Sequence, residues 1–220
     1  MTKQDKNKEE QFKIGTCTKL VPVEPRQELQ VFETEIKGVR VIKKSFHDDA
    51  RGWFQESFRK SELEMILGGK SVEMKQGSIS YSMPGVIRGI HGEMQYKMIT
   101  PLTGRTIGAY VDLRPNSPTF CKWIMLEFDN TSPEGARSGV LLEPGIGNSF
   151  GVVSNTEGLG AFYIYSVSEE YNKGDPGHSI CYNDQIIAIP WDKYIPNPLI
   201  SETRDLKLPG VREVWPDKFK

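Results

Sequence analysis

The chain has 220 residues, a formal net charge of −1, and 37% hydrophobic against 26% charged residues. These values are ordinary for a globular protein that buries a sizeable core, and the near-neutral balance argues against a general binder of nucleic acid or of anionic membranes. No run approaches 18 apolar residues, and the first residues, MTKQDKNKEEQFK, lack an apolar stretch. We therefore expect no membrane span and no signal peptide.

Three cysteines, Cys17, Cys121 and Cys181, are scattered along the chain and form no CxxC pair. An odd and dispersed set of cysteines argues against a disulfide framework and against a zinc knuckle. We therefore expect a reducing compartment, which by default is the cytoplasm.

In chain order, residues 1–13 are strongly polar and are expected to form a flexible tail, followed by a single domain over residues 14–220. The segment KSELEMILGG predicts one helix in the body of this domain. Ser61 is its expected N-cap, Glu64 stands at the spacing of a capping box, and Gly68 and Gly69 should end it.

The rest of the body is cut into short pieces by many of the 21 Gly and 14 Pro residues. The stretch RTIGAYVDLR alternates, so Ile107, Ala109, Val111 and Leu113 should face one way, while CKWIMLEF and AFYIYSV are short β-branched or aromatic runs. Many short strands with turn signals and one short helix predict an all-β sandwich or barrel, such as a jelly roll. The last forty residues, rich in Pro and Trp, are expected to wrap around it.

The stretch VIRGIHGEMQYK, residues 86–97, concentrates Arg88, His91 and Lys97 in one strand-like segment. A general base, a cation for developing negative charge and an Arg for a phosphate form a coherent chemical set. Because Arg88 and His91 are three residues apart, they would point to opposite faces of a regular strand unless a bulge intervenes. Gly89, between them, favours such an irregularity.

A metal-dependent barrel enzyme is the alternative that counting can test. Barrels that bind iron or manganese use a His-x-His pair, a Glu and a later His, whereas this chain has HGE at residues 91–93 and Asn148 in the later segment PGIGNSFGVV. The other two histidines, His47 and His178, lie in polar, turn-like stretches and are expected at the surface. We therefore expect no metal site.

Five segments, in order over roughly residues 39–210, resemble the dTDP-4-dehydrorhamnose 3,5-epimerase family, whose members act in the synthesis of nucleotide-activated 6-deoxysugars. DARGWFQESF resembles the family's D-x-R-G-x-F-x-E-S, GVIRGIHGE its G-V-L-R-G-L-H, and YVDLRPNSPTFCKW its V-D-L-R-x-x-S-P-T-F-x-x-W. LEPGIGNSFGVVSN resembles P-P-G-x-A-H-G-F-x-V-L-S, and ISETRDLKLP resembles L-S-x-K-D-x-x-x-P. Each match alone is weak to moderate, but five in the right order form a strong family signal.

The resemblance implies a cupin-type jelly-roll barrel with short helices, a homodimer with an exchanged N-terminal strand, no cofactor or metal, and a nucleotide-diphospho-4-ketosugar as substrate. It assigns His91 as the base beside the C4 ketone and Asp205 as the carboxylate that holds it. It assigns Lys97 to the enolate oxygen and Tyr165 to reprotonation from the opposite face. Tyr163 is the alternative to Tyr165 if the strand register slips by two.

The resemblance also implies substrate-binding residues. Arg88 corresponds to a diphosphate ligand, and the segment 51–56 corresponds to one that reaches the nucleotide, often that of the partner subunit. The full expected set is Arg88, Arg51, Phe54, Glu56, Gln76, Ser78, Asn148 and Tyr171. An ordinary surface or core role is the alternative for each of them.

Several positions around the expected site depart from the family pattern. Gly92 stands where an aromatic residue is usual, Asn148 where a second His is usual, and Gly77 and Ser78 where Asp and Asn are usual. Asn can form hydrogen bonds but does not titrate. The sequence therefore leaves three hypotheses open: a 3,5-epimerase, a single-centre epimerase on a GDP- or CDP-linked 4-ketosugar, and a sugar-nucleotide-binding barrel without catalysis.

Overall fold

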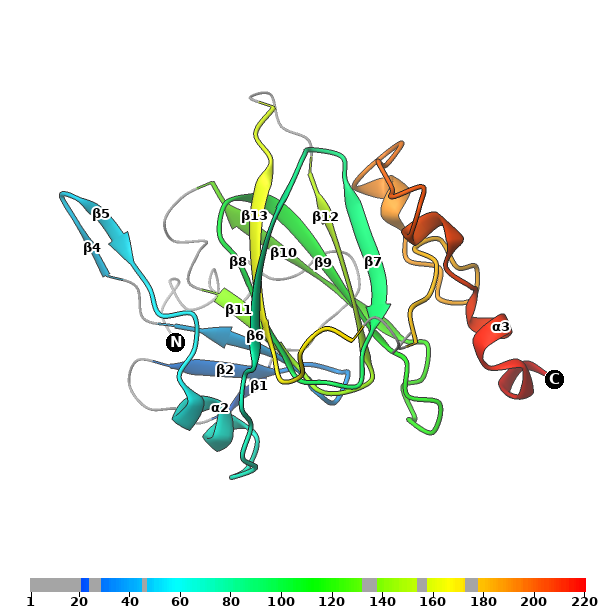
Figure 1. Cartoon of the computed structure of the whole chain (residues 1–220), viewed down its shortest axis with the longest axis horizontal. Coiled ribbons are helices and arrows are strands. Elements are labelled where there is room, and N and C mark those ends of the chain that lie inside the picture. The colour runs from blue at the N-terminus through cyan, green and yellow to red at the C-terminus, as the bar shows by residue number, and fades with distance from the viewer. Residues whose placement is uncertain (1–20, 24–28, 45–46, 132–137, 154–157, 173–177) are drawn as a thin grey trace.

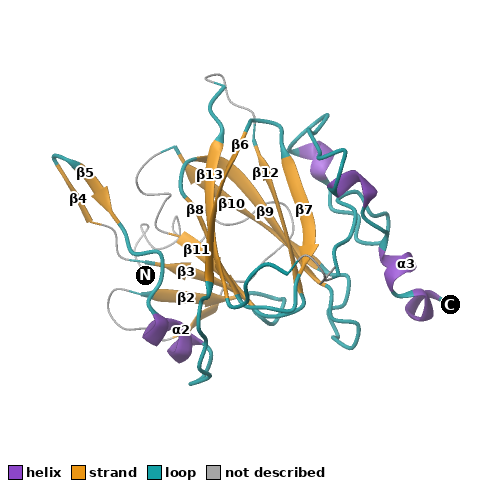
Figure 2. Cartoon of the chain, viewed as in Figure 1, coloured by secondary structure: helices purple, strands orange, loops and turns teal. Residues whose placement is uncertain are grey.

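The structure, a computed structural model, describes residues 21–23, 29–44, 47–131, 138–153, 158–172 and 178–220. Strands dominate these residues and form two large sheets that face each other and a separate two-stranded hairpin, as Figures 1 and 2 show. The prediction of an all-β sandwich of the jelly-roll kind is confirmed. The tail predicted over residues 1–13 lies outside the described residues, so the domain boundary stays a prediction.

The larger sheet has seven antiparallel strands in the order β1-β2-β3-β11-β8-β13-β6. In that order the strands are β1 (Val21–Val23), β2 (Gln30–Glu33), β3 (Val39–Lys43), β11 (Ser138–Leu142), β8 (Lys97–Pro101), β13 (Ala161–Val167) and β6 (Gln76–Ser82). Its inner face contributes Ile99, Val140 and Tyr163 to the core between the sheets. One edge of this sheet is therefore β6.

The smaller sheet has four antiparallel strands in the order β10-β9-β12-β7. They are β10 (Trp123–Asn130), β9 (Gly104–Asp112), β12 (Ile146–Val152) and β7 (Ile87–Gly92). Tyr110, Leu126 and Phe150 extend from it into the core between the sheets. Its edge strand β7 follows the edge strand β6 of the other sheet in the sequence, so the two edges are joined by a short turn.

Strand β9 alternates as the sequence predicts. Tyr110 joins the core between the sheets, whereas Ile107, Ala109, Val111 and the following Leu113 belong to a second core on the outer side of the smaller sheet. Both faces of the strand are therefore buried, which explains the unbroken run without polar side chains from Ile107 to Val111.

Residues 178–220 cover this outer face, at the right in Figure 1. They contain η3 (Trp191–Lys193), η4 (Asp205–Lys207), α3 (Val211–Val214) and η5 (Pro216–Phe219). Trp191 is buried in the same core as Ile87 of β7. This packing brings η4 against β7, where the Gly89 amide donates a hydrogen bond to Asp205 Oδ2 at 3.2 Å.

The predicted helix is present as α2 (Lys60–Ile66), but its start differs from the prediction. The N-cap is Arg59 and no side chain caps the helix, so the prediction of a Ser61 cap with a capping box is wrong. Ser61 lies inside the first turn, where its hydroxyl is no longer at the capping position. Gly68 and Gly69 follow the helix with φ angles of 69° and 88°, which end it as predicted.

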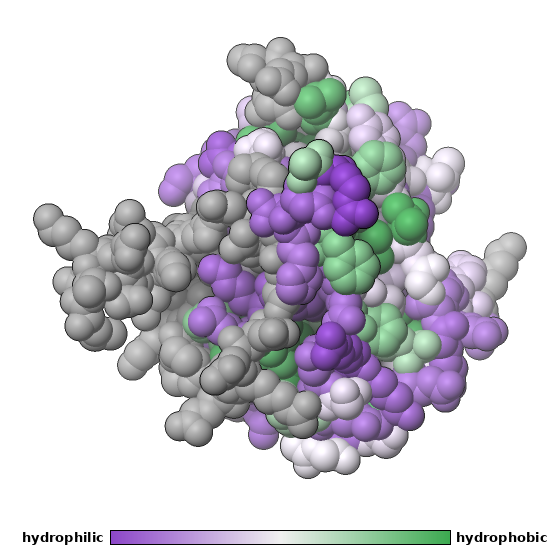
Figure 3. All heavy atoms as spheres, turned by 90° about the vertical axis from the view of Figure 1, so that its left-hand side faces the viewer, coloured by the Kyte–Doolittle hydropathy of each residue, from purple (hydrophilic) through white to green (hydrophobic). Residues whose placement is uncertain are grey.

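A hairpin of β4 (His47–Asp49) and β5 (Gly52–Phe54) projects from the sandwich on the side opposite to residues 178–220 (Figure 1). Trp53 and Phe54 are 43% and 63% exposed. Figure 3 looks onto this side, where hydrophobic and hydrophilic side chains lie intermixed. Within the described part of the chain, no helix has the length and apolar character to cross a membrane.

Candidate active site

A β-bulge in β7 brings two basic side chains, Arg88 and His91, to one face. His91 pairs with Asn148 of β12, and Arg88 pairs with Phe150, so β7 advances three residues while β12 advances two. Phe150 belongs to the core between the sheets, and Asn148 accepts a hydrogen bond from the buried Tyr163 hydroxyl. Because directly paired residues share a face, Arg88 and His91 both lie on the inner face of the sheet. The sequence predicts a shared face for Arg88 and His91 only if a bulge intervenes, and the structure contains that bulge.

Gly89 allows this bulge. Its φ angle is 119°, a conformation that side chains rarely adopt, and a Cβ here would lie 2.7 Å from the Asn148 carbonyl oxygen and from the Ser149 Cα. No other residue fits this backbone without displacing β12. The close approach also leaves the Gly89 amide free to face Asp205, which accepts its hydrogen bond.

His91 and Asp205 form a pair, with Nε2 and Oδ1 3.0 Å apart although 114 residues separate them in the sequence. The Asp205 side chain is only 5% exposed. Burial acts to raise the pKa of this carboxyl, but the hydrogen bond and charge of His91 and the Gly89 amide outweigh it, so the pKa lies below its usual value. An ionised carboxylate in this place orients the imidazole and strengthens its other nitrogen as a base.

Lys97 and Tyr165 lie on the inner face of the larger sheet. Lys97 begins β8 and pairs with Val167 of β13, whereas Ile99, two residues later, pairs with Tyr165. Ile99 is part of the core between the sheets, so all four positions share that face. The Lys97 side chain is 8% exposed, and its Nζ lies 5.2 Å from the centroid of the Tyr165 ring.

The turn between β7 and β8 adds Glu93, whose Oε2 lies 2.6 Å from Lys97 Nζ. Burial acts to raise the pKa of Glu93, but the charge and hydrogen bond of Lys97, with help from Gln95 and His91, hold it below its usual value. Glu93 is a site residue that the sequence motifs do not single out, and its spacing of four from Lys97 is the available signal. Across the described residues, no three His, Cys, Asp or Glu side chains gather into a metal-binding group.

The chain matches a known protein family over most of its length. The family model for dTDP-4-dehydrorhamnose 3,5-epimerase matches residues 33–213. The chain belongs to this family. The dTDP-4-dehydrorhamnose 3,5-epimerase of Shigella flexneri is 33% identical over 195 residues, which cover 87% of this chain and 99% of that protein. The enzyme of the same name from Escherichia coli K12 is 35% identical over 170 residues, covering 74% and 85%.

Solved structures of epimerases have the same fold. A 4-keto-6-deoxy sugar epimerase from Streptomyces spheroides superposes with a TM-score of 0.75 and 28% identity, covering 89% of this chain and 94% of that one. The dTDP-6-deoxy-D-glucose-3,5-epimerase of Legionella pneumophila, in complex with dTDP-4-keto-L-rhamnose, gives 0.74 and 25%, covering 86% and 96%. A 3'-monoepimerase from Streptomyces bikiniensis, in complex with dTDP-quinovose, gives 0.71 and 27%, covering 83% and 89%. The sandwich is thus the cupin-type jelly roll of a family of isomerases.

The two candidate tyrosines of this dTDP-4-dehydrorhamnose 3,5-epimerase family member differ in environment. Tyr163 is 1% exposed, its ring stacks on Phe150 with centroids 3.9 Å apart, and its hydroxyl lies 3.4 Å from Asn148 Oδ1. Burial, together with the nearby Tyr110, raises the pKa of Tyr163 well above its usual value. Tyr165 is half-buried. It is therefore the more accessible of the two hydroxyl-bearing rings.

Three of the expected binding residues are joined beside Tyr165. Ser78 of β6 pairs with Tyr165, and Gln76 Nε2 donates a hydrogen bond to Ser78 Oγ at 3.1 Å. Gln76 Oε1 accepts the Tyr171 amide at 2.7 Å. Arg88 Nε donates a hydrogen bond of 2.8 Å to a serine hydroxyl at the other end of β6. The edges β6 and β7 therefore carry these groups around the same open side of the sandwich.

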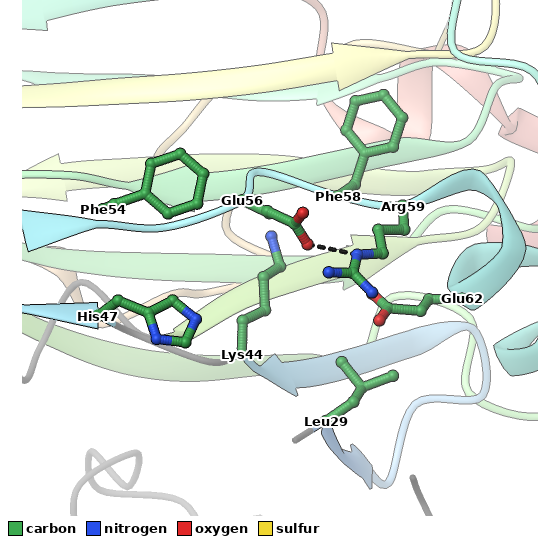
Figure 4. A pocket seen from close by; sticks show the side chains of 8 residues that line it. All are labelled: Leu29, Lys44, His47, Phe54, Glu56, Phe58, Arg59 and Glu62. Carbon is green, nitrogen blue, oxygen red and sulfur yellow. Dashed lines mark hydrogen bonds and ion pairs between the residues drawn. The ribbon is translucent and has the colours of Figure 1, made fainter. Parts of the chain in front are cut away.

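The structure does not bring Arg51, Phe54 and Glu56 to this side. They lie on the hairpin β4–β5 and just after it, away from the inner faces of the sheets (Figure 1). Phe54 and Glu56 line a cavity of about 130 Å³ at the base of the hairpin, where Glu56 accepts a hydrogen bond from Arg59 at 2.5 Å (Figure 4). Lys44 points into the same cavity, and burial lowers the pKa of its ammonium to about 8.

One departure from the family pattern, Gly92, has a local packing cause. A Cβ on Gly92 would lie 2.4 Å from the His178 carbonyl oxygen and 2.7 Å from Leu113 Cδ1. The C-terminal segment thus occupies the space of the aromatic side chain that is usual there. Asn148 pairs directly with His91, so it faces the same space as the base. His47 and His178 are exposed, as predicted.

Proposed function

We propose that the chain inverts C3, C5 or both in a nucleotide-linked 4-keto-6-deoxyhexose, with dTDP-4-keto-6-deoxyglucose as the expected substrate. The observation that carries this proposal is His91, held by Asp205, on the inner face of one sheet, with Lys97 and Tyr165 on the inner face of the other. A base and an acid on two facing sheets are the arrangement that inversion of a carbon requires.

The chemistry follows from the ketone. The C4 carbonyl acidifies the protons at C3 and C5, and His91 removes one of them. The electron pair moves to the C4 oxygen, where the Lys97 ammonium stabilises the enolate. Tyr165 then donates its proton to the same carbon from the opposite face, and exchange with water restores both groups. An acid or base in such a step typically contributes about 10²–10⁴-fold to the rate.

The proposed substrate rests on the family and on its ligands. The similar Legionella and Streptomyces bikiniensis proteins were solved with dTDP-linked sugars. Arg88 on the open side of the sandwich suits one phosphate of such a ligand, because a guanidinium can bind phosphate with two parallel hydrogen bonds. In this proposal Gln76, Ser78, Asn148 and Tyr171 contact the sugar or the nucleotide.

We include a homodimer in the proposal. Arg51, Phe54 and Glu56 lie far from His91 in their own chain, on a hairpin that projects with exposed aromatic side chains. A second copy can receive that hairpin, so that each site combines residues of two subunits. This supports the expectation that the segment contacts the nucleotide of the partner.

The test is turnover of defined substrates. The protein is incubated with dTDP-, GDP- and CDP-linked 4-keto-6-deoxyglucose, and the configuration at C3 and C5 of the product is determined by NMR coupling constants. Inversion of both centres of the dTDP sugar is expected. Inversion of one centre makes the chain a single-centre epimerase, and binding without any inversion of the three sugars overturns the proposal in favour of a binding barrel.

A further inference from the structure

Glu93 is a carboxylate in the proposed site that the proposed mechanism does not use. Its Oε2 accepts hydrogen bonds from Lys97 Nζ at 2.6 Å and from Gln95 Nε2 at 2.7 Å. His91 also contributes, as a smaller cause, to the lowered pKa of Glu93. In the sequence, Glu93 lies between the proposed base and the proposed enolate-binding cation, on the turn that joins their two strands.

The burial of Lys97 explains why a carboxylate is required beside it. The Lys97 side chain is 8% exposed, and an ammonium removed from water is costly unless an opposite charge stands beside it. Its contacts include the Glu93 carboxylate and the Tyr165 ring, while β11 presents the apolar Leu142 at the paired position. Of these groups Glu93 carries the negative charge, and stabilisation of an enolate requires Lys97 in its charged form.

The carboxylate is itself held in place. The Glu169 amide donates a hydrogen bond to Gln95 Oε1 at 3.1 Å, and Gln95 in turn donates to Glu93. The next residue, Tyr96, exchanges hydrogen bonds of 3.0 Å with Ser168. The turn is thus pinned to the segment that follows β13, the strand of Tyr165. A fixed Glu93 fixes the direction of the Lys97 ammonium as well.

We infer that Glu93 is a positioning residue, which keeps Lys97 charged and aims it at the C4 oxygen of the substrate. An ammonium has three donors, so Lys97 can hold Glu93 and still donate to the enolate. This inference rests on the proposed function for its catalytic meaning, but the pairing of Glu93 and Lys97 can be measured without turnover.

The direct experiment measures the charge of Lys97. The protein, the Glu93→Gln variant and a Glu127→Gln control are acylated with an amine-reactive ester from pH 6 to 11, and the Lys97 peptide is quantified by mass spectrometry. Glu127 also belongs to an ion pair, with Arg105 between β9 and β10. Loss of the contacting carboxylate should lower the pH at which Lys97 becomes labelled, and it should do so in Glu93→Gln only. An unchanged midpoint overturns the inference.

Kinetics provide the second readout. Because the reaction uses charged Lys97, kcat/KM of Glu93→Gln should fall off at a lower pH on the alkaline side than kcat/KM of the unaltered protein, and Glu93→Asp should restore part of the range. A variant that loses activity equally at every pH would show a merely structural role and contradict the inference. An unaltered protein without epimerase activity would refute the proposed function instead, and the labelling result would still decide the pairing.

Discussion

The Asp205 carboxyl is the residue on which the site depends. It is buried, it binds His91 and the Gly89 amide, and it comes from a short 3-10 helix that the C-terminal segment carries to the edge of the smaller sheet. A carboxylate in this position needs its partners, because an unpaired buried charge is strongly destabilising. One side chain therefore joins the stability of the fold to the chemistry of the proposed base.

Its pKa yields a prediction about stability and pH. The pKa of Asp205 is below its usual value in the folded protein, so the ionised carboxylate stabilises the fold above about pH 4, and this contribution is lost as the pH falls through the lowered value. Urea unfolding at pH 7 should find Asp205→Asn less stable than the unaltered protein, with the difference shrinking toward pH 3. Asp192→Asn, at an exposed position in η3, serves as the control. A difference that stays constant with pH would contradict the account.

The two tyrosines of β13 should separate acid from scaffold. Tyr165→Phe should abolish inversion while His91 still exchanges a substrate proton with solvent, because only the donor on the opposite face is lost. Tyr163→Phe removes a buried hydroxyl bonded to Asn148 and should cost about 1 kcal/mol of stability with little loss of inversion. Product configuration by NMR and thermal unfolding measure the two effects. The reverse outcome would assign Tyr163 as the acid.

At the scale of the element, the geometry of strand β7 determines which side chains lie together in the proposed site. Its bulge puts Arg88 and His91 on one face, and its edge position lets Asp205 reach His91 from outside the sandwich. The same strand feeds the turn that holds Glu93 against Lys97. A regular strand would place only one of the two β7 side chains in the site.

Gly89→Ala tests the bulge. The added Cβ would meet the backbone of Asn148 and Ser149 at 2.7 Å in a conformation with φ of 119°. We expect a loss of about 2 kcal/mol or more in the free energy of unfolding, measured with urea. Gly77→Ala on β6, where a Cβ meets nothing within 4 Å, is the matched control and should be close to neutral. Equal stability of the two variants would refute the constraint.

Local patterns explain which elements the sequence predicts and which it misses. The alternation of apolar residues predicts which side chains of β9 share a face, because the pleat of a strand alone sets the face of each residue. The sequence does not predict the start of α2, because its N-cap is Arg59 and no side chain caps the helix. The His91–Asp205 pair spans 114 residues, so resemblance rather than pattern led to it. The Glu93–Lys97 pair was within reach of spacing but depends on the geometry of the turn.

At the scale of the whole molecule, two described segments outside the sandwich have opposite roles. Residues 178–220 pack onto their own smaller sheet and deliver Asp205. The hairpin β4–β5 instead projects outward with Trp53 and Phe54 exposed. One extension completes the site from within the chain, and in the proposed dimer the other completes the site of a second copy.

Complementation tests this division of labour. His91→Ala and Arg51→Ala subunits are unfolded together, refolded as a mixture and assayed. If Arg51 acts in the site of the partner, each mixed dimer has one intact site, so random pairing should restore about a quarter of the unaltered activity. The two variants assayed separately are the controls. No recovery in a mixture shown to contain mixed dimers would mean that Arg51 acts within its own chain, and full activity of Arg51→Ala alone would mean that Arg51 acts in neither site.

The most direct test of the central claim is proton exchange. The protein is incubated in D₂O with dTDP-4-keto-6-deoxyglucose, and deuterium at C3 and C5 is followed by NMR, with His91→Ala measured in parallel. Deuterium should appear at the inverted carbon or carbons, with the rate reduced at least about 10²-fold in the variant. Exchange that proceeds equally well without His91 would contradict its role as the base, and the absence of any exchange in the unaltered protein would contradict catalysis on this substrate.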